Sequence, residues 1–165
     1  MTQTHRITSL AQAIVKIGSA KGIMVATAES CTGGMVAAAL TDVPGSSAVV
    51  DRGFVTYTNE AKQEMLGVPM ALIEKHGAVS GEVVRAMARG ALLHSRADIA
   101  VSVTGIAGPT GGTAEKPVGL VWFGYADAQG LVRAERRVFT TGSRDFVRTK
   151  ATETALALIF SQLSG

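Results

Sequence analysis

The chain has 165 residues, of which 47% are hydrophobic and 18% charged; this is enough for a single folded domain over residues 1–165 and argues against disorder. The net charge of +3 permits an anionic ligand, but the basic residues are scattered and only 5% of residues are aromatic, so direct binding of nucleic acid is not expected. There is no signal-peptide pattern, no apolar run near the ~20 residues of a membrane span and no cysteine besides Cys31, so we expect a cytoplasmic protein without a membrane partner.

The first part of the chain alternates helix and strand patterns. Apolar residues recur at helical spacing over residues 10–17 and predict a helix that ends at Gly22. The apolar run at residues 23–27 predicts a strand, and residues 35–40 predict the helix behind it. A second strand is predicted over residues 49–58.

Small and polar residues mark the turns and helix starts that follow. Gly53, inside the second predicted strand, indicates a bulge or a close backbone approach. Asn59 is predicted to cap a short helix, and Ser80 and Ser143 to cap two later ones. Between these two caps, residues 99–103 predict a buried strand.

The clearest hairpin of the sequence has its arms at residues 118–126 and 131–139. Because hairpin strands are antiparallel and helix-linked strands are parallel, we predict an α/β fold with a mixed sheet. A long glycine-rich loop, residues 104–117, precedes the hairpin, and loops of this kind are usually functional or mobile. Apolar residues on the hairpin lead us to expect a homo-oligomer, with a dimer as the simplest case.

The most informative motif is Ala-Glu-Ser-Cys-Thr-Gly-Gly at residues 28–34. It places Ser30 at a turn between a predicted strand and a predicted helix. Free backbone N–H groups at the start of a helix favour negative charge, so they suit a bound anion or the oxyanion of an attacked carbonyl. The alternative is a tight turn whose small residues only allow a helix to pack on a sheet.

Lys62 is the candidate base for a Ser30 nucleophile. None of the three histidines adjoins a motif, whereas Lys62 falls in the first turn of a predicted helix. The positive end of the helix dipole lowers the pKa of an amine there, and burial would lower it further. A serine–lysine pair needs that neutral amine. The alternative is an exposed lysine on a short helix.

Two further candidates, Cys31 and Arg144, each have a structural alternative. Cys31 beside a helix N-terminus would be an activated thiol and a rival nucleophile, unless it is only a small buried residue. Arg144 falls in the first turn of the last predicted helix, where it suits an anion, unless it is an ordinary surface arginine. No His or Cys group has metal-ligand spacing and residues 105–112 lack the ending of a P-loop, so we expect no metal and no cofactor.

Six motifs follow one another along nearly the whole chain. They are Ala-Glu-Ser-Cys-Thr-Gly-Gly (28–34), Pro-Gly-Ser-Ser (44–47), Tyr-Thr-Asn-Glu-Ala-Lys (57–62), Gly-Ala-Val-Ser (77–80), Thr-Gly-Ile-Ala-Gly-Pro (104–109) and Lys-Pro-Val-Gly (116–119). In this order they resemble the C-terminal domain of the competence/damage-inducible protein CinA, the nicotinamide-nucleotide amidohydrolase family. The resemblance implies a three-layer α/β/α fold and hydrolysis of nicotinamide mononucleotide to nicotinic acid mononucleotide and ammonia, a step of pyridine nucleotide salvage. Many family members carry an additional N-terminal domain, for which this chain leaves no room.

The resemblance also implies roles for individual residues. Ser30 matches the family's nucleophile, Lys62 its base and Tyr57 a neighbouring tyrosine. Ser47 and Thr104 match positions that line the same pocket, and Arg144 matches a binding arginine near the nucleotide. We expect further substrate contacts from residues beside these motif positions: Cys31, Thr32, Gly33, Gly34 and Gly105.

In the expected mechanism, neutral Lys62 takes the proton of Ser30, which attacks the carboxamide. Backbone N–H groups of residues 32–34 hold the oxyanion, and Lys62 or Tyr57 protonates the departing ammonia. The alternative from another class is a nucleotide- or phosphate-binding module of the same fold without turnover, in which the glycine-rich loop and Arg144 bind the ligand.

Overall fold

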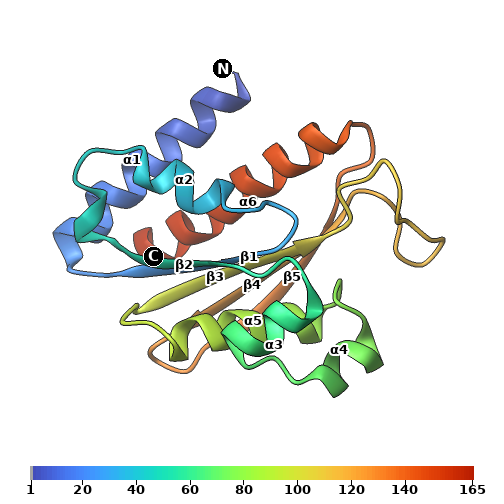
Figure 1. The fold of residues 1–165 in the computed structure, drawn as a ribbon. Coiled ribbons are helices and arrows are strands. Elements are labelled where there is room, and N and C mark those ends of the chain that lie inside the picture. Colours follow the sequence, from blue (N-terminus) through green and yellow to red (C-terminus); the bar gives the residue numbers. More distant parts are fainter. Residues whose placement is uncertain (1) are drawn as a thin grey trace.

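The structure, a computed structural model, describes residues 2–165 and contains a five-stranded sheet flanked by helices (Figure 1). The helices are α1 (Gln3–Lys21), α2 (Met35–Thr41), the 3-10 helix η1 (Ser46–Ala48), α3 (Asn59–Leu66), α4 (Met70–His76), α5 (Gly81–Leu93) and α6 (Arg144–Ser164). The strands are β1 (Val25–Glu29), β2 (Val50–Val55), β3 (Ile99–Gly105), β4 (Leu120–Asp127) and β5 (Val132–Val138).

The sheet has the strand order β2-β1-β3-β4-β5. Strand β1 is parallel to both β2 and β3, whereas β4 is antiparallel to β3 and to β5. The predicted mixed sheet and the predicted hairpin are therefore confirmed. Because β1, β2 and β3 run in the same direction, the segments that follow them emerge at one edge of the sheet, where α/β proteins usually bind ligands.

Helices cover both faces of the sheet. Figure 1 shows α1, α2 and α6 on one face and α3, α4 and α5 on the other. This arrangement confirms the predicted three-layer α/β/α fold. It also means that a residue at the edge of the sheet can be reached by helices from two opposite sides.

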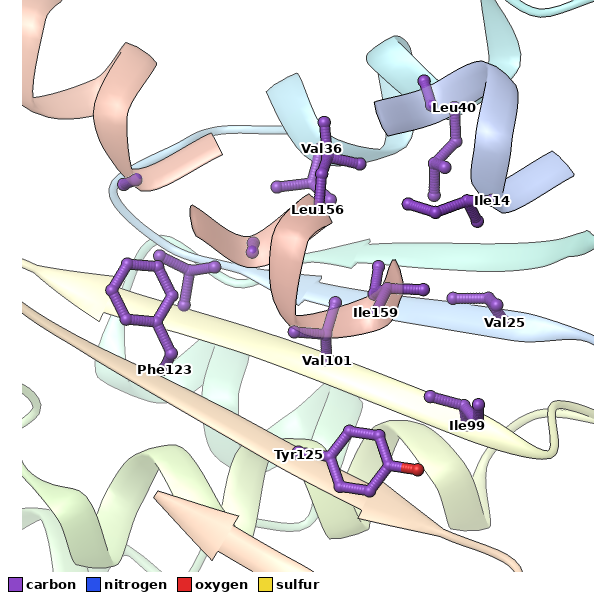
Figure 2. Close-up of a cluster of buried hydrophobic side chains, with 14 of the residues drawn as sticks. Ile14, Val25, Val36, Leu40, Ile99, Val101, Phe123, Tyr125, Leu156 and Ile159 are labelled. Carbon is purple, nitrogen blue, oxygen red and sulfur yellow. The ribbon is translucent and has the colours of Figure 1, made fainter. Parts of the chain in front are cut away.

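Alternation along β1 decides which residues enter which half of the core. Successive side chains of a strand point to opposite faces, so Val25 packs with α1, α2 and α6, whereas Ala26 and Ala28 pack on the side of α5. In the first cluster, Ile14, Val36 and Leu156 from the helices face Val25, Val101 and Phe123 from the strands (Figure 2). The same alternation sends Glu29 toward α2 and Ser30 toward α3, which their hydrogen bonds bear out.

Strand β1 begins two residues later than predicted, at Val25 rather than at residue 23. The N–H of Ile23 donates to the carbonyl oxygen of Gly18, so Ile23 still belongs to the end of α1, which stops at Gly22 in the left-handed conformation as predicted. The next N–H, of Met24, donates to the carboxylate of Asp98. Neither group is therefore free to join the sheet.

The start of α3 also differs from the prediction. Thr58, not Asn59, is the N-cap: its backbone is extended and its hydroxyl accepts the N–H of Ala61. Asn59 is the first helical residue, and β2 correspondingly ends at Val55 instead of residue 58. The predicted caps Ser80 and Ser143 are confirmed by the same kind of hydrogen bond.

Gly53 is a position of close approach, but the approaching atoms belong to side chains and not to the backbone that the sequence indicated. A Cβ atom at this position would lie 2.7 Å from Oγ1 of Thr27 on the neighbouring strand. The irregularity in the pairing of β1 with β2 lies nearer their starts, between Val25 and Ala26. Glycine therefore lets the two strands pass at normal sheet distance where a side chain would push them apart.

Candidate active site

Ser30 is the first residue after β1, and backbone hydrogen bonds define the turn that it opens. Its N–H donates to the carbonyl oxygen of Val103 at 2.9 Å, and its own carbonyl oxygen accepts the N–H of Gly33 at 3.0 Å. Gly33 and Gly34 have φ angles of 58° and 102°, in the left-handed region that residues with a Cβ atom avoid. The two glycines let the chain reverse direction before α2 begins at Met35.

Glu29 holds the start of α2 against the turn that follows Ser30. Its side chain is 1% exposed, and its two carboxylate oxygens accept the N–H groups of Val36 at 2.9 Å and Ala37 at 3.1 Å. These are N–H groups that a short helix would otherwise leave open, so any oxyanion donors must come from the turn itself. Glu29 was not among the site residues predicted from the sequence, although a carboxylate that accepts N–H groups at a helix start is ordinary capping chemistry.

Lys62 reaches Ser30 from α3. Its Nζ lies 3.2 Å from Oγ of Ser30 and donates to the carbonyl oxygen of Thr56 at 3.0 Å. The side chain is 1% exposed, and none of the ion pairs among residues 2–165 includes it. Burial without a counter-charge lowers the pKa of this amine, in the direction that a base requires. The exposed lysine that the sequence left open is thereby excluded.

Cys31 lies beside Ser30 but is not an activated thiol. The side chain is 5% exposed and packs in the core cluster between the sheet and α1, α2 and α6. Burial raises the pKa of the Cys31 thiol to about 12. Of the two alternatives for Cys31, the structure supports the small buried residue, because desolvation of the thiolate raises its pKa more than the backbone hydrogen bond and the nearby Arg148 lower it.

Arg144 connects two segments at this edge of the sheet. Its guanidinium donates to the carbonyl oxygen of Gly108 at 2.9 Å and to the hydroxyl of Tyr57 at 2.8 Å. Tyr57 is 61% exposed, so its ring stands at the surface with Arg144 and the glycine-rich loop. No hydrogen bond among residues 2–165 joins Tyr57 to Lys62; the structure brings Tyr57 together with Arg144 instead.

Arg148, one helical turn beyond Arg144, also points at the motif. Its Nε donates to the carbonyl oxygen of Cys31 at 3.0 Å, and one terminal nitrogen lies 3.5 Å from the carbonyl oxygen of Thr32. Arg148 was not among the site residues predicted from the sequence. Its spacing could have found it, because residues four apart lie on the same face of a helix.

Thr104 and Gly105 end β3 next to the turn that follows Ser30. The hydroxyl of Thr104 is buried and donates to the carbonyl oxygen of Ala78, in the segment before α5. A Cβ atom at Gly105 would lie 2.8 Å from the carbonyl oxygen of Leu120, so this position needs glycine for the strands to pair. Both residues thus shape the wall of the site through the backbone around them.

Ser47 does not lie near the other candidates. It is exposed in η1, which precedes β2, and β2 begins beside Val25 at the start of β1. Ser30 follows the opposite end of β1. The structure therefore separates Ser47 from Ser30 by the length of the strand, and we assign it no role in this site.

Together these residues place a hydroxyl against a buried amine of lowered pKa, beside a turn rich in backbone N–H groups. This arrangement is suited to attack of a serine on a carbonyl carbon. Within residues 2–165, no group of three His, Cys, Asp or Glu side chains is arranged to hold a metal ion. In the same part of the chain, no helix combines the length and apolarity needed to cross a membrane.

Comparison with known proteins gives close sequence relatives over most of the chain. A nicotinamide-nucleotide amidohydrolase PncC of Escherichia coli (strain K12) is 56% identical over 143 residues, which covers 87% of this chain and 86% of that protein. The protein of the same name from Enterobacter agglomerans is also 56% identical, over 140 residues covering 83% and 85%. A CinA-like protein of Geobacter sulfurreducens is 51% identical, and the match spans 87% of this chain but 34% of that longer protein.

Solved structures with the same fold carry related titles. The competence/damage inducible protein CihA from Agrobacterium tumefaciens superposes with a TM-score of 0.94 at 49% identity, covering 97% of this chain and 96% of that one. A CinA superfamily protein from Escherichia coli superposes with a TM-score of 0.90 at 34% identity, covering 98% and 93%. The family model of the CinA C-terminal domain matches residues 7–163, and this chain therefore belongs to that family.

Proposed function

We propose that this protein is a nicotinamide-nucleotide amidohydrolase, which converts nicotinamide mononucleotide and water into nicotinic acid mononucleotide and ammonia in pyridine nucleotide salvage. Relatives named for this activity are 56% identical to it over more than four fifths of both chains, which supports the assignment. The structural observation that carries it is the 3.2 Å distance between Nζ of buried Lys62 and Oγ of Ser30. An amide is a poor electrophile, and a hydroxyl beside a desolvated amine is a nucleophile strong enough to attack it.

In the acylation half of the reaction, neutral Lys62 accepts the proton of Ser30 as Oγ forms a bond to the carboxamide carbon. Backbone N–H groups of the turn stabilise the oxyanion of the tetrahedral intermediate. The C–N bond then breaks, and the Lys62 ammonium returns its proton to the departing nitrogen, which leaves as ammonia. We give this proton transfer to Lys62 and not to Tyr57, since Lys62 is the group in contact with Ser30.

In the deacylation half, water attacks the ester carbon while Lys62 accepts its proton. The ester C–O bond to Ser30 breaks, and the proton on Lys62 passes to Oγ, so the enzyme returns to its starting state. Neutral Lys62 is thus needed twice. The rate should accordingly rise with pH as the amine loses its proton, with a midpoint below the ordinary lysine pKa because burial lowers it.

The ribose phosphate of the substrate is proposed to lie toward Arg144 and Tyr57. Both residues stand at the surface next to the glycine-rich loop, and a guanidinium is a strong partner for a phosphate. Gly34, Thr104 and Gly105 border the same region and are proposed to contact the nicotinamide end. No redox cofactor takes part in this hydrolysis.

We also propose that residues 1–165 act as one domain in the cytoplasm, where a free thiol such as Cys31 stays reduced. One continuous sheet carries both core clusters, which supports a single folding unit. A homodimer is proposed as well, because Leu131 of the hairpin is 42% exposed and apolar. Analytical ultracentrifugation of the wild type and of Leu131→Glu tests the dimer.

The test of the activity is ammonia release from nicotinamide mononucleotide by the wild type and by Ser30→Ala, without added metal. We expect release by the wild type and less than about 1% of that rate from the variant. Ser161→Ala, at an exposed serine on α6, is the matched control and should keep the wild-type rate.

Two results would contradict the proposal. Binding of the nucleotide by the wild type without ammonia release would favour the non-catalytic binding module. Full activity of Ser30→Ala would place the nucleophile on another residue.

A further inference from the structure

The peptide group between Cys31 and Thr32 is held from one side by a side chain that does not approach Ser30 Oγ. Arg148 donates from Nε to the carbonyl oxygen of Cys31 at 3.0 Å. A terminal nitrogen of the same guanidinium lies 3.5 Å from the carbonyl oxygen of Thr32, so two successive carbonyl groups of the turn face Arg148. A Cβ atom at Gly33 would lie 3.3 Å from that nitrogen, so the absence of a side chain at this position leaves room for the Arg148 guanidinium.

Because the peptide group is planar, the direction of the Cys31 carbonyl also fixes the direction of the Thr32 N–H bond. In a trans peptide the C=O and the following N–H point in opposite directions. With the Cys31 carbonyl directed at Arg148 on α6, the Thr32 N–H is directed away from α6. Lys62 reaches Ser30 from α3, on the opposite face of the sheet (Figure 1). The Thr32 N–H is thus turned toward the side on which the serine and the lysine meet.

This N–H group is unusual because it is buried and has no acceptor. Thr32 is 0% exposed, and its N–H donates to no atom of residues 2–165. Buried backbone N–H groups without a partner are rare in folded proteins. The neighbouring donor of the turn, the Gly33 N–H, is bound to the carbonyl oxygen of Ser30 and is not available.

We propose that the Thr32 N–H is a donor to the oxyanion formed at Ser30, and that Arg148 is the residue that positions it. This inference rests on the proposed function, because it needs a carbonyl carbon attacked by Ser30. Arg148 touches neither the substrate nor Ser30; it acts through the peptide group. A cation on the carbonyl oxygen also polarises the peptide, which strengthens its N–H as a donor.

The experiment compares the wild type with Arg148→Met, which keeps the apolar stem and removes both donors, and with Arg148→Lys, which keeps one cationic donor. Lys150→Met, two residues further along α6 where the lysine pairs with Glu153, is the control for loss of a cation from this helix. The kcat and KM for nicotinamide mononucleotide are measured by ammonia release. Affinity for pyridine-3-boronic acid, which forms a tetrahedral adduct with a serine hydroxyl, is measured by titration calorimetry.

We expect Arg148→Met to lower kcat by ~30- to 300-fold, near the effect of losing one oxyanion donor, with KM changed less than about threefold. Boronate affinity should fall by a similar factor, and Arg148→Lys should recover part of both losses. The proposal would be overturned by unchanged kcat and boronate affinity in both Arg148 variants, or by a rise in KM alone. It would also be overturned if Lys150→Met lost as much kcat and boronate affinity as Arg148→Met. Should Arg148→Met fail to fold, Arg148→Lys decides by the same criteria.

The boronate titration also separates this inference from the proposed function. A wild type that binds boronate but releases no ammonia contradicts the amidohydrolase, while the loss of affinity in the Arg148 variants still tests the positioning. A wild type that binds no boronate has no oxyanion site at Ser30, and the inference is then wrong.

Discussion

Replacing Lys62 by methionine should abolish ammonia release and, at pH 8, stabilise the fold. Methionine has a similar unbranched shape and fits the buried position without a charge. The proposed mechanism needs a neutral amine in the folded protein, whereas the unfolded chain keeps its proton up to pH 10.5. Because burial lowers the pKa of Lys62 from 10.5, removing that proton on folding costs at most about 3.4 kcal/mol at pH 8.

The substitution also removes the donor of the Thr56 carbonyl, a loss of about 1–2 kcal/mol. The net expectation at pH 8 is that Lys62→Met is more stable than the wild type, by up to about 2 kcal/mol. For a domain of this size that corresponds to a rise in Tm of roughly 4–8 °C. An inactive variant that is more stable than the wild type would show that the fold carries this lysine for its chemistry.

The sign of the pH dependence follows from which state holds the proton. Between the lowered pKa of folded Lys62 and 10.5, the unfolded chain binds more protons than the folded one. Raising the pH through this window therefore stabilises the wild type, by at most about 1.4 kcal/mol per pH unit. The stability of Lys62→Met does not rise with pH in this way. The difference in free energy of unfolding that favours the variant should therefore shrink toward pH 10.5, where the variant should be slightly less stable than the wild type.

Urea unfolding followed by the fluorescence of Trp122, at several values between pH 7 and 10.5, measures this difference. Other titrating groups are common to both proteins and cancel in the comparison. Lys16→Met, at an exposed position of α1, controls for the change in net charge. Parallel stability curves for the wild type and Lys62→Met over the whole range would refute the reasoning, because the folded amine would then hold its proton as tightly as the unfolded one.

Three further predictions concern the surroundings of the site. Burial raises the pKa of the Cys31 thiol to about 12, so at pH 8 it should react with iodoacetamide at least ~100-fold more slowly in the folded than in the urea-unfolded protein, as followed by mass spectrometry. Equal labelling rates in the two states would contradict this. The variant Cys31→Ala should keep its activity within about threefold of the wild type. Glu29→Gln should lose about 2–3 kcal/mol in urea unfolding, since an amide nitrogen would face an N–H of α2, and a change below about 0.5 kcal/mol would speak against the capping role. Gly124→Ala should lose about 3 kcal/mol by the same assay, because its Cβ would collide with the Val84 carbonyl oxygen; wild-type stability would mean that α5 can move off the sheet.

Local patterns in the sequence were enough to predict most elements and their ends. The helix caps Ser80 and Ser143 and the stop at Gly22 depend on residues within one turn, so they could be predicted without knowledge of the fold. The mixed sheet followed from helix-linked strands and a hairpin. The late start of β1 depends in part on a partner distant in sequence, because the N–H of Met24 is bound by Asp98, 74 residues away.

The candidate site needed more than local patterns. Ser30 and Lys62 could be proposed as a pair from their motifs, but their contact joins residues 32 apart and exists because parallel strands deliver both segments to one edge of the sheet. The hydrogen bond from Arg148 to the carbonyl oxygen of Cys31 joins residues 117 apart; the spacing of Arg148 from Arg144 indicated a shared helix face but not this partner. Ser47, a member of one of the six motifs, lies in η1 near the start of β1, whereas Ser30 follows the end of that strand.

The sequence by itself thus determined the order of helices and strands, the strained glycine turn after β1, and the chemical groups available at that turn. Only the tertiary structure decided how those groups behave. Burial lowers the pKa of Lys62 and raises that of Cys31, because desolvation disfavours whichever form is charged: the protonated amine in one case and the thiolate in the other. The same physical effect favours the neutral amine that the proposed mechanism needs and the neutral, unreactive thiol, and it depends on packing that no local stretch of sequence contains.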